Sequence, residues 1–201
     1  IERVALFGFS YGVQVALEAW RLFPERISGF VLVAGPAGDP LSAVYDLGIP
    51  PRVWRATAGN LARYLPRSTQ AAWHAAFHLP IWHPLATFAR LTRAEPAHLK
   101  PFLDHQTRLH VPTALRMAVA AGEHSARDLL PSIRVPTLVV AGGRDTVTPL
   151  SHLEVLRDGI PGAGWLLVPE GTHTLLVEDP ERIGTRVRAF LTSVHEPMGG
   201  A

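Results

Sequence analysis

A five-residue turn near the start of the chain, residues 8–12 (Gly-Phe-Ser-Tyr-Gly), limits the folds that this sequence can adopt. The preceding run, Val4–Phe7, is rich in branched and aromatic residues, which is typical of a buried strand. The following residues, Gln14–Leu22, place apolar side chains on one face of a helix. A strand and a helix are therefore joined by a very sharp turn, with Ser10 at its apex.

Gly8 and Gly12 flank this serine on either side. We expect a Cβ at either position to collide with the neighbouring strand or helix. The turn should force strained backbone angles on Ser10 and lift its hydroxyl clear of the sheet. It also places Ser10 at a helix N-terminus, where free N–H groups and the helix dipole favour negative charge.

Three further apolar runs predict strands at Ile27–Ala34, Thr137–Gly142 and Trp165–Val168. Helices are expected between and after the later strands, at Leu150–Arg157 and Pro180–Val194. Strand, helix and strand at this spacing form right-handed parallel units, and a parallel sheet needs helices on both faces. The fold class is therefore α/β, with a doubly wound and mostly parallel sheet.

Residues 41–130 contain no convincing strand, and several prolines divide them into short helical stretches. The expected helices are Pro51–Tyr64, Thr69–Phe77, Pro84–Leu91, Pro96–Arg108 and Pro112–Ala121.

The composition excludes several classes of protein. The chain of 201 residues has no cysteine, so it has no disulfides or thiolate zinc sites. A net charge of +2, with scattered arginines, argues against nucleic-acid binding. No apolar run is long enough to span a membrane, and no signal peptide opens the chain. We therefore expect a cytoplasmic protein whose partner is a small molecule.

Three groups with complementary chemistry follow the strands in the order Ser10, Asp145, His173. A serine hydroxyl needs a base to remove its proton, histidine titrates near neutral pH, and an aspartate can orient the imidazole. The turn at residues 8–12 and this chain order resemble the α/β-hydrolase family. The resemblance implies Ser10 as nucleophile, His173 as base, Asp145 as the acid and no cofactor. It also implies that the backbone N–H of Tyr11 stabilises an oxyanion.

Rivals exist for two of these roles. Asp39 follows the second predicted strand, where some family members carry the acid, and His152 competes with His173. We favour Asp145 because it lies in a glycine-rich turn just past a strand. We favour His173 because the Glu178-Asp179-Pro180 context resembles the family's C-terminal signature.

The chain differs from the commonest elbow of the family at Val13, where a second glycine often occurs. It also enters a predicted core strand almost at once after Ile1. We therefore expect further strands, and the second oxyanion donor, upstream of Ile1. Residues 1–201 expressed alone should then be poorly soluble and nearly inactive.

The helical stretch is similar to the cap that many α/β-hydrolases place over the active site. This predicts a core of residues 1–38 and 131–201 and a cap of residues 39–130. Aromatic residues in the stretch are expected to line an apolar pocket for an acyl or alkyl group. The candidates are Trp54, Trp73, Phe77, Trp82 and Phe88.

His74 and His78 would share a helix face in this stretch, but no third ligand stands at metal-binding spacing. We interpret them as polar positions and expect no metal. The predicted function is a serine hydrolase that cleaves a small ester or related carbonyl compound. Two alternatives stay open: a cofactor-free perhydrolase or haloperoxidase, and a homologue that binds a small molecule without catalysis.

Overall fold

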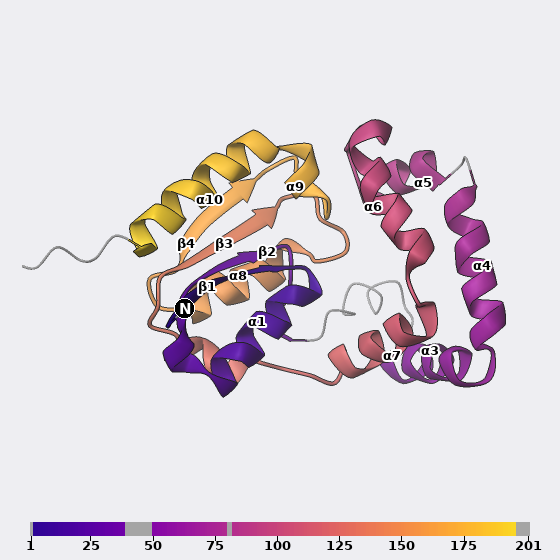
Figure 1. The fold of residues 1–201 in the computed structure, drawn as a ribbon, viewed down its shortest axis with the longest axis horizontal. Helices are drawn as coiled ribbons and strands as arrows, with labels where there is room; N and C mark the ends of the chain where they lie inside the picture. The colour runs from indigo at the N-terminus through magenta and orange to yellow at the C-terminus, as the bar shows by residue number, and fades with distance from the viewer. Residues whose placement is uncertain (1, 39–49, 80–81, 196–201) are drawn as a thin grey trace, which may run out of the picture.

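The computed structural model describes residues 2–38, 50–79 and 82–195, and these residues build a parallel sheet flanked by helices (Figure 1). The described sheet has four strands in the order β1-β2-β3-β4, so each strand pairs with its neighbour in sequence. The strands are β1 (Val4–Phe9), β2 (Ile27–Val33), β3 (Thr137–Gly142) and β4 (Gly164–Val168). The prediction of an α/β fold with a parallel sheet is confirmed.

Helices cover the two faces of the sheet (Figure 1). The chain between the end of β2 and the start of β3 forms a separate group of helices. Those on the sheet are α1 (Tyr11–Leu22), α8 (Leu150–Gly159), α9 (Leu175–Glu178) and α10 (Pro180–His195). The separate group contains α3 (Pro51–Tyr64), α4 (Pro66–His78), α5 (Trp82–Phe88), α6 (Pro96–Arg108) and α7 (Val111–Ala121). Short 3-10 helices occur at η1 (Pro24–Arg26) and η2 (Arg127–Ser132). The predicted helix bounds agree with these to within a few residues.

Alternating side chains of the central strands build two cores. Phe30 and Leu32 of β2 lie in one core, with residues of α1 and α8. Val31 and Val33 point to the opposite face and pack with residues of α9 and α10. All four side chains are fully buried. Both faces of β2 are therefore covered, which is why its sequence is apolar without alternation.

The first strand is less buried than its sequence predicts. β1 pairs with β2 along one edge, and in the described part of the chain its other edge has no partner. Val4 is 38% exposed and Phe7 is 50% exposed. In the described residues the predicted core strand is therefore a partly buried edge strand, because β2 pairs with one of its edges and no described strand pairs with the other.

The helices α3 to α7 pack mainly on one another, to one side of the sheet (Figure 1). Side chains of α4 tie this group together: the Gln70 amide donates to Leu109 O at 2.9 Å, and the Trp73 indole donates to Gln106 O at 3.0 Å. The backbone N–H of Val111 donates to Gln70 Oε1 at 2.9 Å. These bonds fix the stretch between α6 and α7.

Within the described residues, no helix is long and apolar enough to cross a membrane.

Candidate active site

Ser10 occupies a strained backbone position between β1 and α1. Its φ is 53° and its ψ is −122°, a conformation that residues with a Cβ rarely adopt. The Ser10 N–H donates to Val33 O at 2.9 Å, and the Val13 N–H donates to Ser10 O at 3.0 Å. The strand ladder therefore holds the serine on one side, and the first turn of the helix holds it on the other.

Two glycines permit this turn: Gly8, as the sequence predicts, and Gly35 in place of Gly12. A Cβ on Gly8 would lie 2.7 Å from Gly12 O, and a Cβ on Gly35 would lie 2.1 Å from Ser10 O. Around Gly12, by contrast, no described atom lies within 4 Å of the Cβ position, apart from its chain neighbours and the backbone of its own helix. The expectation of a collision at Gly12 is therefore wrong. Gly35, which sequence reasoning missed, makes the closest approach to Ser10.

Gly35 also explains how the turn accommodates Val13. The Val13 side chain is fully buried, and its Cγ2 lies 2.6 Å from the Cβ position of Gly35. In the commonest elbow, a glycine at the position of Val13 leaves space between the helix and the sheet. Here Gly35, after β2, leaves that space instead. Gly35 therefore makes room for the side chain of Val13.

Asp145 lies in the loop after β3, and its side chain is fully buried. Its Oδ1 accepts hydrogen bonds from the backbone N–H groups of Val147 and Thr148, both at 2.8 Å. This leaves Oδ2 free to face the neighbouring loop. The two loops also join through their backbones, because the Arg144 N–H donates to Gly171 O at 2.9 Å.

His173 lies in the loop after β4 and connects the other two residues. Its Nδ1 is 2.9 Å from Asp145 Oδ2, and its Nε2 is 2.9 Å from Ser10 Oγ. The ring is 16% exposed and packs beside Phe9, with ring centroids 5.3 Å apart. If the proton of the neutral ring lies on Nδ1, facing the carboxylate, Nε2 can accept the hydroxyl proton of Ser10.

The structure therefore brings Ser10, Asp145 and His173 together at the carboxyl ends of β1, β3 and β4. Of the rival residues, His152 lies in the first turn of α8. Asp39 lies outside the residues that the structure describes.

A second carboxylate, that of Glu178, organises the loop that carries His173. Glu178 Oε2 accepts the backbone N–H of Thr172 at 2.9 Å, and Oε1 lies 2.7 Å from the Thr174 hydroxyl. Oε1 also accepts the Arg93 N–H at 2.9 Å and contacts the Thr172 hydroxyl. Burial alone would raise the pKa of Glu178. The hydrogen bonds from the hydroxyl and N–H of Thr172, and from Thr174 and Arg93, outweigh burial and lower this pKa below its usual value.

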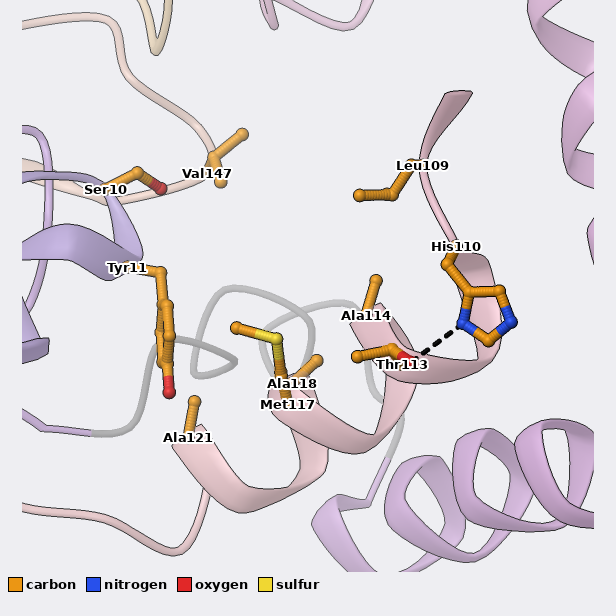
Figure 2. Close-up of a pocket in the computed structure, with 10 residues that line it drawn as sticks. All are labelled: Ser10, Tyr11, Leu109, His110, Thr113, Ala114, Met117, Ala118, Ala121 and Val147. Carbon is orange, nitrogen blue, oxygen red and sulfur yellow. Dashed lines mark hydrogen bonds between the residues drawn. The ribbon is translucent and has the colours of Figure 1, made fainter. Parts of the chain in front are cut away.

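A cavity of about 510 Å³ opens beside Ser10, between the start of α1 and one face of α7 (Figure 2). Figure 2 shows Ser10, Tyr11 and Val147 on one side and residues of α7 on the other. Most of the lining is aliphatic. The lining residues are Ser10, Tyr11, Leu109, His110, Thr113, Ala114, Met117, Ala118, Ala121 and Val147.

None of the aromatic side chains suggested by the sequence is among the described residues that line this cavity. Trp73, Phe77 and Trp82 stack on one another, with ring centroids 4.7 and 4.9 Å apart. Phe88 is 87% exposed, and Trp54 lies on α3. Spacing along α4 brings Trp73 and Phe77 to one helix face, where they pair with each other instead of facing Ser10.

The rings of His74 and His78 also pair, with centroids 4.4 Å apart. Within the described part of the chain, no group of three or more His, Cys, Asp or Glu residues is arranged to hold a metal ion.

The fold and this arrangement define the class of protein. A family model described as alpha/beta hydrolase fold matches residues 1–180. The chain therefore belongs to the α/β-hydrolase family.

Several known proteins resemble the chain. It is 29% identical over 196 residues to a dihydrolipoyllysine-residue acetyltransferase component of an acetoin cleaving system from Pseudomonas putida, covering 95% of this chain and 46% of that protein. It is 34% identical over 99 residues to a pimeloyl-(acyl-carrier protein) methyl ester esterase from Neisseria meningitidis, covering 48% of this chain and 32% of that protein. The chain thus spans less than half the length of either relative.

Among solved structures, an esterase from Thermogutta terrifontis superposes with a TM-score of 0.70 at 24% identity, covering 96% of this chain and 66% of that one. At this level of identity the likeness concerns the fold.

The close approach at Gly35 predicts opposite effects for two glycine substitutions. Gly35→Ala should destabilise the protein by about 1–3 kcal/mol, because its Cβ would press on the Ser10 carbonyl. Gly12→Ala is the matched control and should be neutral or stabilising, because its Cβ meets open space on a helix. Denaturant unfolding measures both free energies. Equal losses for the two variants would contradict this account of the turn.

The lowered pKa of Glu178 predicts how stability depends on pH. A carboxylate with a depressed native pKa contributes stability above its unfolded pKa and loses it as pH falls through the native pKa. The difference in unfolding free energy between wild type and Glu178→Gln should therefore be largest above about pH 5 and shrink below about pH 4. Urea titrations across this range measure it. A difference that grows on acidification would contradict the assignment.

Proposed function

We propose that this protein is a serine hydrolase that cleaves an ester or a related carbonyl compound through an acyl-enzyme on Ser10. The observation that carries the proposal is the continuous chain of hydrogen bonds from Ser10 through His173 to Asp145, at the edge of an apolar cavity. The similarity of part of the chain to a methyl ester esterase supports an ester as substrate.

In the first half of the reaction, Ser10 Oγ attacks the substrate carbonyl carbon while its proton moves to His173 Nε2. The resulting oxyanion needs hydrogen-bond donors. The Tyr11 N–H stands at the first residue of α1, where helix N–H groups have no intrahelical acceptor. When the tetrahedral intermediate collapses, the bond to the leaving group breaks, and that group departs with the proton from His173. The acyl group remains on Ser10.

In the second half, water attacks the acyl carbon and gives a proton to His173. Collapse of the second intermediate breaks the bond to Ser10 Oγ, which recovers the proton, and releases the acid. Throughout the cycle the Asp145 carboxylate orients the ring and stabilises the imidazolium. Its two backbone hydrogen bonds suit this role, since they hold the carboxylate in one orientation.

The cavity defines the substrate class that we propose. Leu109, Ala114, Met117 and Ala118 offer an aliphatic wall opposite Ser10, so the acyl or alkyl part of the substrate should be apolar (Figure 2). We infer that residues 39–130 act as the cap over the site, because α7 and the stretch before it supply most of that wall.

The nucleophile is tested by Ser10→Ala. In the full-length protein, kcat/KM for a p-nitrophenyl ester should fall at least about a thousandfold while the melting temperature changes little. A fluorophosphonate probe should label the wild type and fail to label the variant. The matched control is Ser151→Ala, at an exposed position in the first turn of α8, which should keep activity and labelling.

Near-normal turnover by Ser10→Ala would refute this role for Ser10. A wild-type protein that neither hydrolyses esters nor reacts with the probe would indicate a binding protein instead.

The substrate class is tested by Ala118→Phe, which fills part of the cavity. The ratio of kcat/KM for octanoate over acetate esters should fall about 10- to 100-fold, because the phenylalanine ring occupies space that the longer acyl chain needs. Ala120→Phe is the matched control: the residue is on the same helix, exposed and not part of the lining. Chain-length preference that moves equally in both variants, or in neither, would contradict this pocket.

A further inference from the structure

We propose that residues Ala89–Arg93, together with Glu178, form a clamp that positions both Asp145 and His173 for the reaction. This inference rests on the proposed function of those two residues. The clamp segment joins α5 to α6, so it belongs to the helical group and not to the sheet.

The clamp holds the loop of Asp145 through Thr146, the next residue in the chain. The Thr146 hydroxyl donates to Ala89 O at 3.2 Å, with Arg90 O at 3.4 Å. On the other side of this loop, Val147 and Thr148 donate to the Asp145 carboxylate. The loop is therefore held by the helical group and the aspartate together.

The same segment holds the loop of His173 through the residues on either side of it. The Thr172 hydroxyl is 3.2 Å from Leu91 O, and the Thr174 hydroxyl is 2.7 Å from the hydroxyl of Thr92. A second layer of contacts encloses these hydroxyls. Arg93 donates its N–H to Glu178, and its guanidinium donates to Glu170 O.

Thr92 is the centre of the clamp because its hydroxyl has no access to water. The residue is fully buried, and its Oγ1 also accepts the Ala94 N–H at 3.1 Å. Removing the hydroxyl would take away the acceptor of the Ala94 N–H and would break the link to Thr174, whose hydroxyl would then be held only from the side of Glu178. An unsatisfied polar group in the interior is costly, so the loops would move to recover these bonds.

The path of the segment is fixed at its start. Arg90 has a φ of 56°, which reverses the chain after α5, and Leu91 N–H donates back to Ala86 O at 2.8 Å. At its other end, the His83 ring lies 3.0 Å from Ala94 O. The segment is thus held against α5, and its polar groups face the two loops.

The clamp should affect the chemical step more than substrate binding. None of its residues is among the described residues that line the cavity beside Ser10. Small displacements of His173 or Asp145 would instead disturb the bonds to Ser10, and misplacement by about 1 Å can cost about 100-fold in rate. The clamp residues are therefore positioning residues.

The test compares Thr92→Val, which removes the hydroxyl at nearly constant shape, with Thr92→Ser, which keeps it. The matched control is Thr69→Val, since that hydroxyl donates to Leu65 O at 2.7 Å within the helical group and touches neither loop. Glu178→Gln is the second probe, in case Thr92→Val folds poorly. The measurements are kcat and KM for a p-nitrophenyl ester, and hydrogen exchange of the Thr148 and Thr172 amides.

Thr92→Val and Glu178→Gln should each lower kcat about 10- to 100-fold with KM within about twofold, and speed exchange at both amides. Thr92→Ser and Thr69→Val should stay near wild type. The clamp would be refuted if Thr92→Ser lost as much as Thr92→Val, or if exchange at both amides were unchanged. Because exchange needs no turnover, it decides on the clamp even if the wild type hydrolyses no ester, a result that would refute the proposed function alone.

Discussion

The site depends first on the close approach of two backbones, at Ser10 and Gly35. The positive φ of Ser10 is held by a hydrogen bond to β2 and by the first turn of α1, and only a residue without a Cβ fits at Gly35 beside it. Strain of this kind persists only where surrounding structure fixes it. The two cores on either side of β2 provide that support, because they bury every residue of the strand from Gly29 to Val33. The strained backbone conformation of Ser10 thus depends on the whole sheet and not on the five-residue turn alone.

Two buried or half-buried carboxylates then fix the loops that face Ser10. Asp145 uses one oxygen to collect two backbone N–H groups of its own loop and the other to meet His173. Glu178 performs a similar task for the loop of His173 by accepting the Thr172 N–H. A carboxylate that accepts several N–H bonds stiffens the loop that donates them, and in Glu178 such bonds also lower the pKa. The loops can therefore hold a hydrogen-bond chain to Ser10 although neither is part of a helix or strand.

The helical group contributes in two places that differ in chemistry. Its α7 offers an aliphatic face to the cavity, whereas Ala89–Arg93 offers carbonyls and a hydroxyl to the two loops and an N–H to Glu178. If this group acts as a cap, the same set of helices contacts the substrate and holds the loops of Asp145 and His173. That connection would make the rate of the chemical step sensitive to how the helices sit on the sheet.

The sequence by itself determined the parallel α/β fold and the positions of the strands and most helices, because apolar runs and prolines are local signals. It also indicated Ser10, Asp145 and His173, because in a parallel sheet residues just past the strand ends meet at one edge. The tertiary structure alone decided the rest. The role of Gly35, the open space at Gly12 and the exposure of Phe7 depend on neighbours that are distant in the chain. The same holds for the cavity. The aromatic residues were the strongest signal for a pocket in the sequence, but Trp73, Phe77 and Trp82 pack on one another, and residues of α7 face Ser10 instead. Which apolar side chains meet is set by helix packing, which no local pattern specifies.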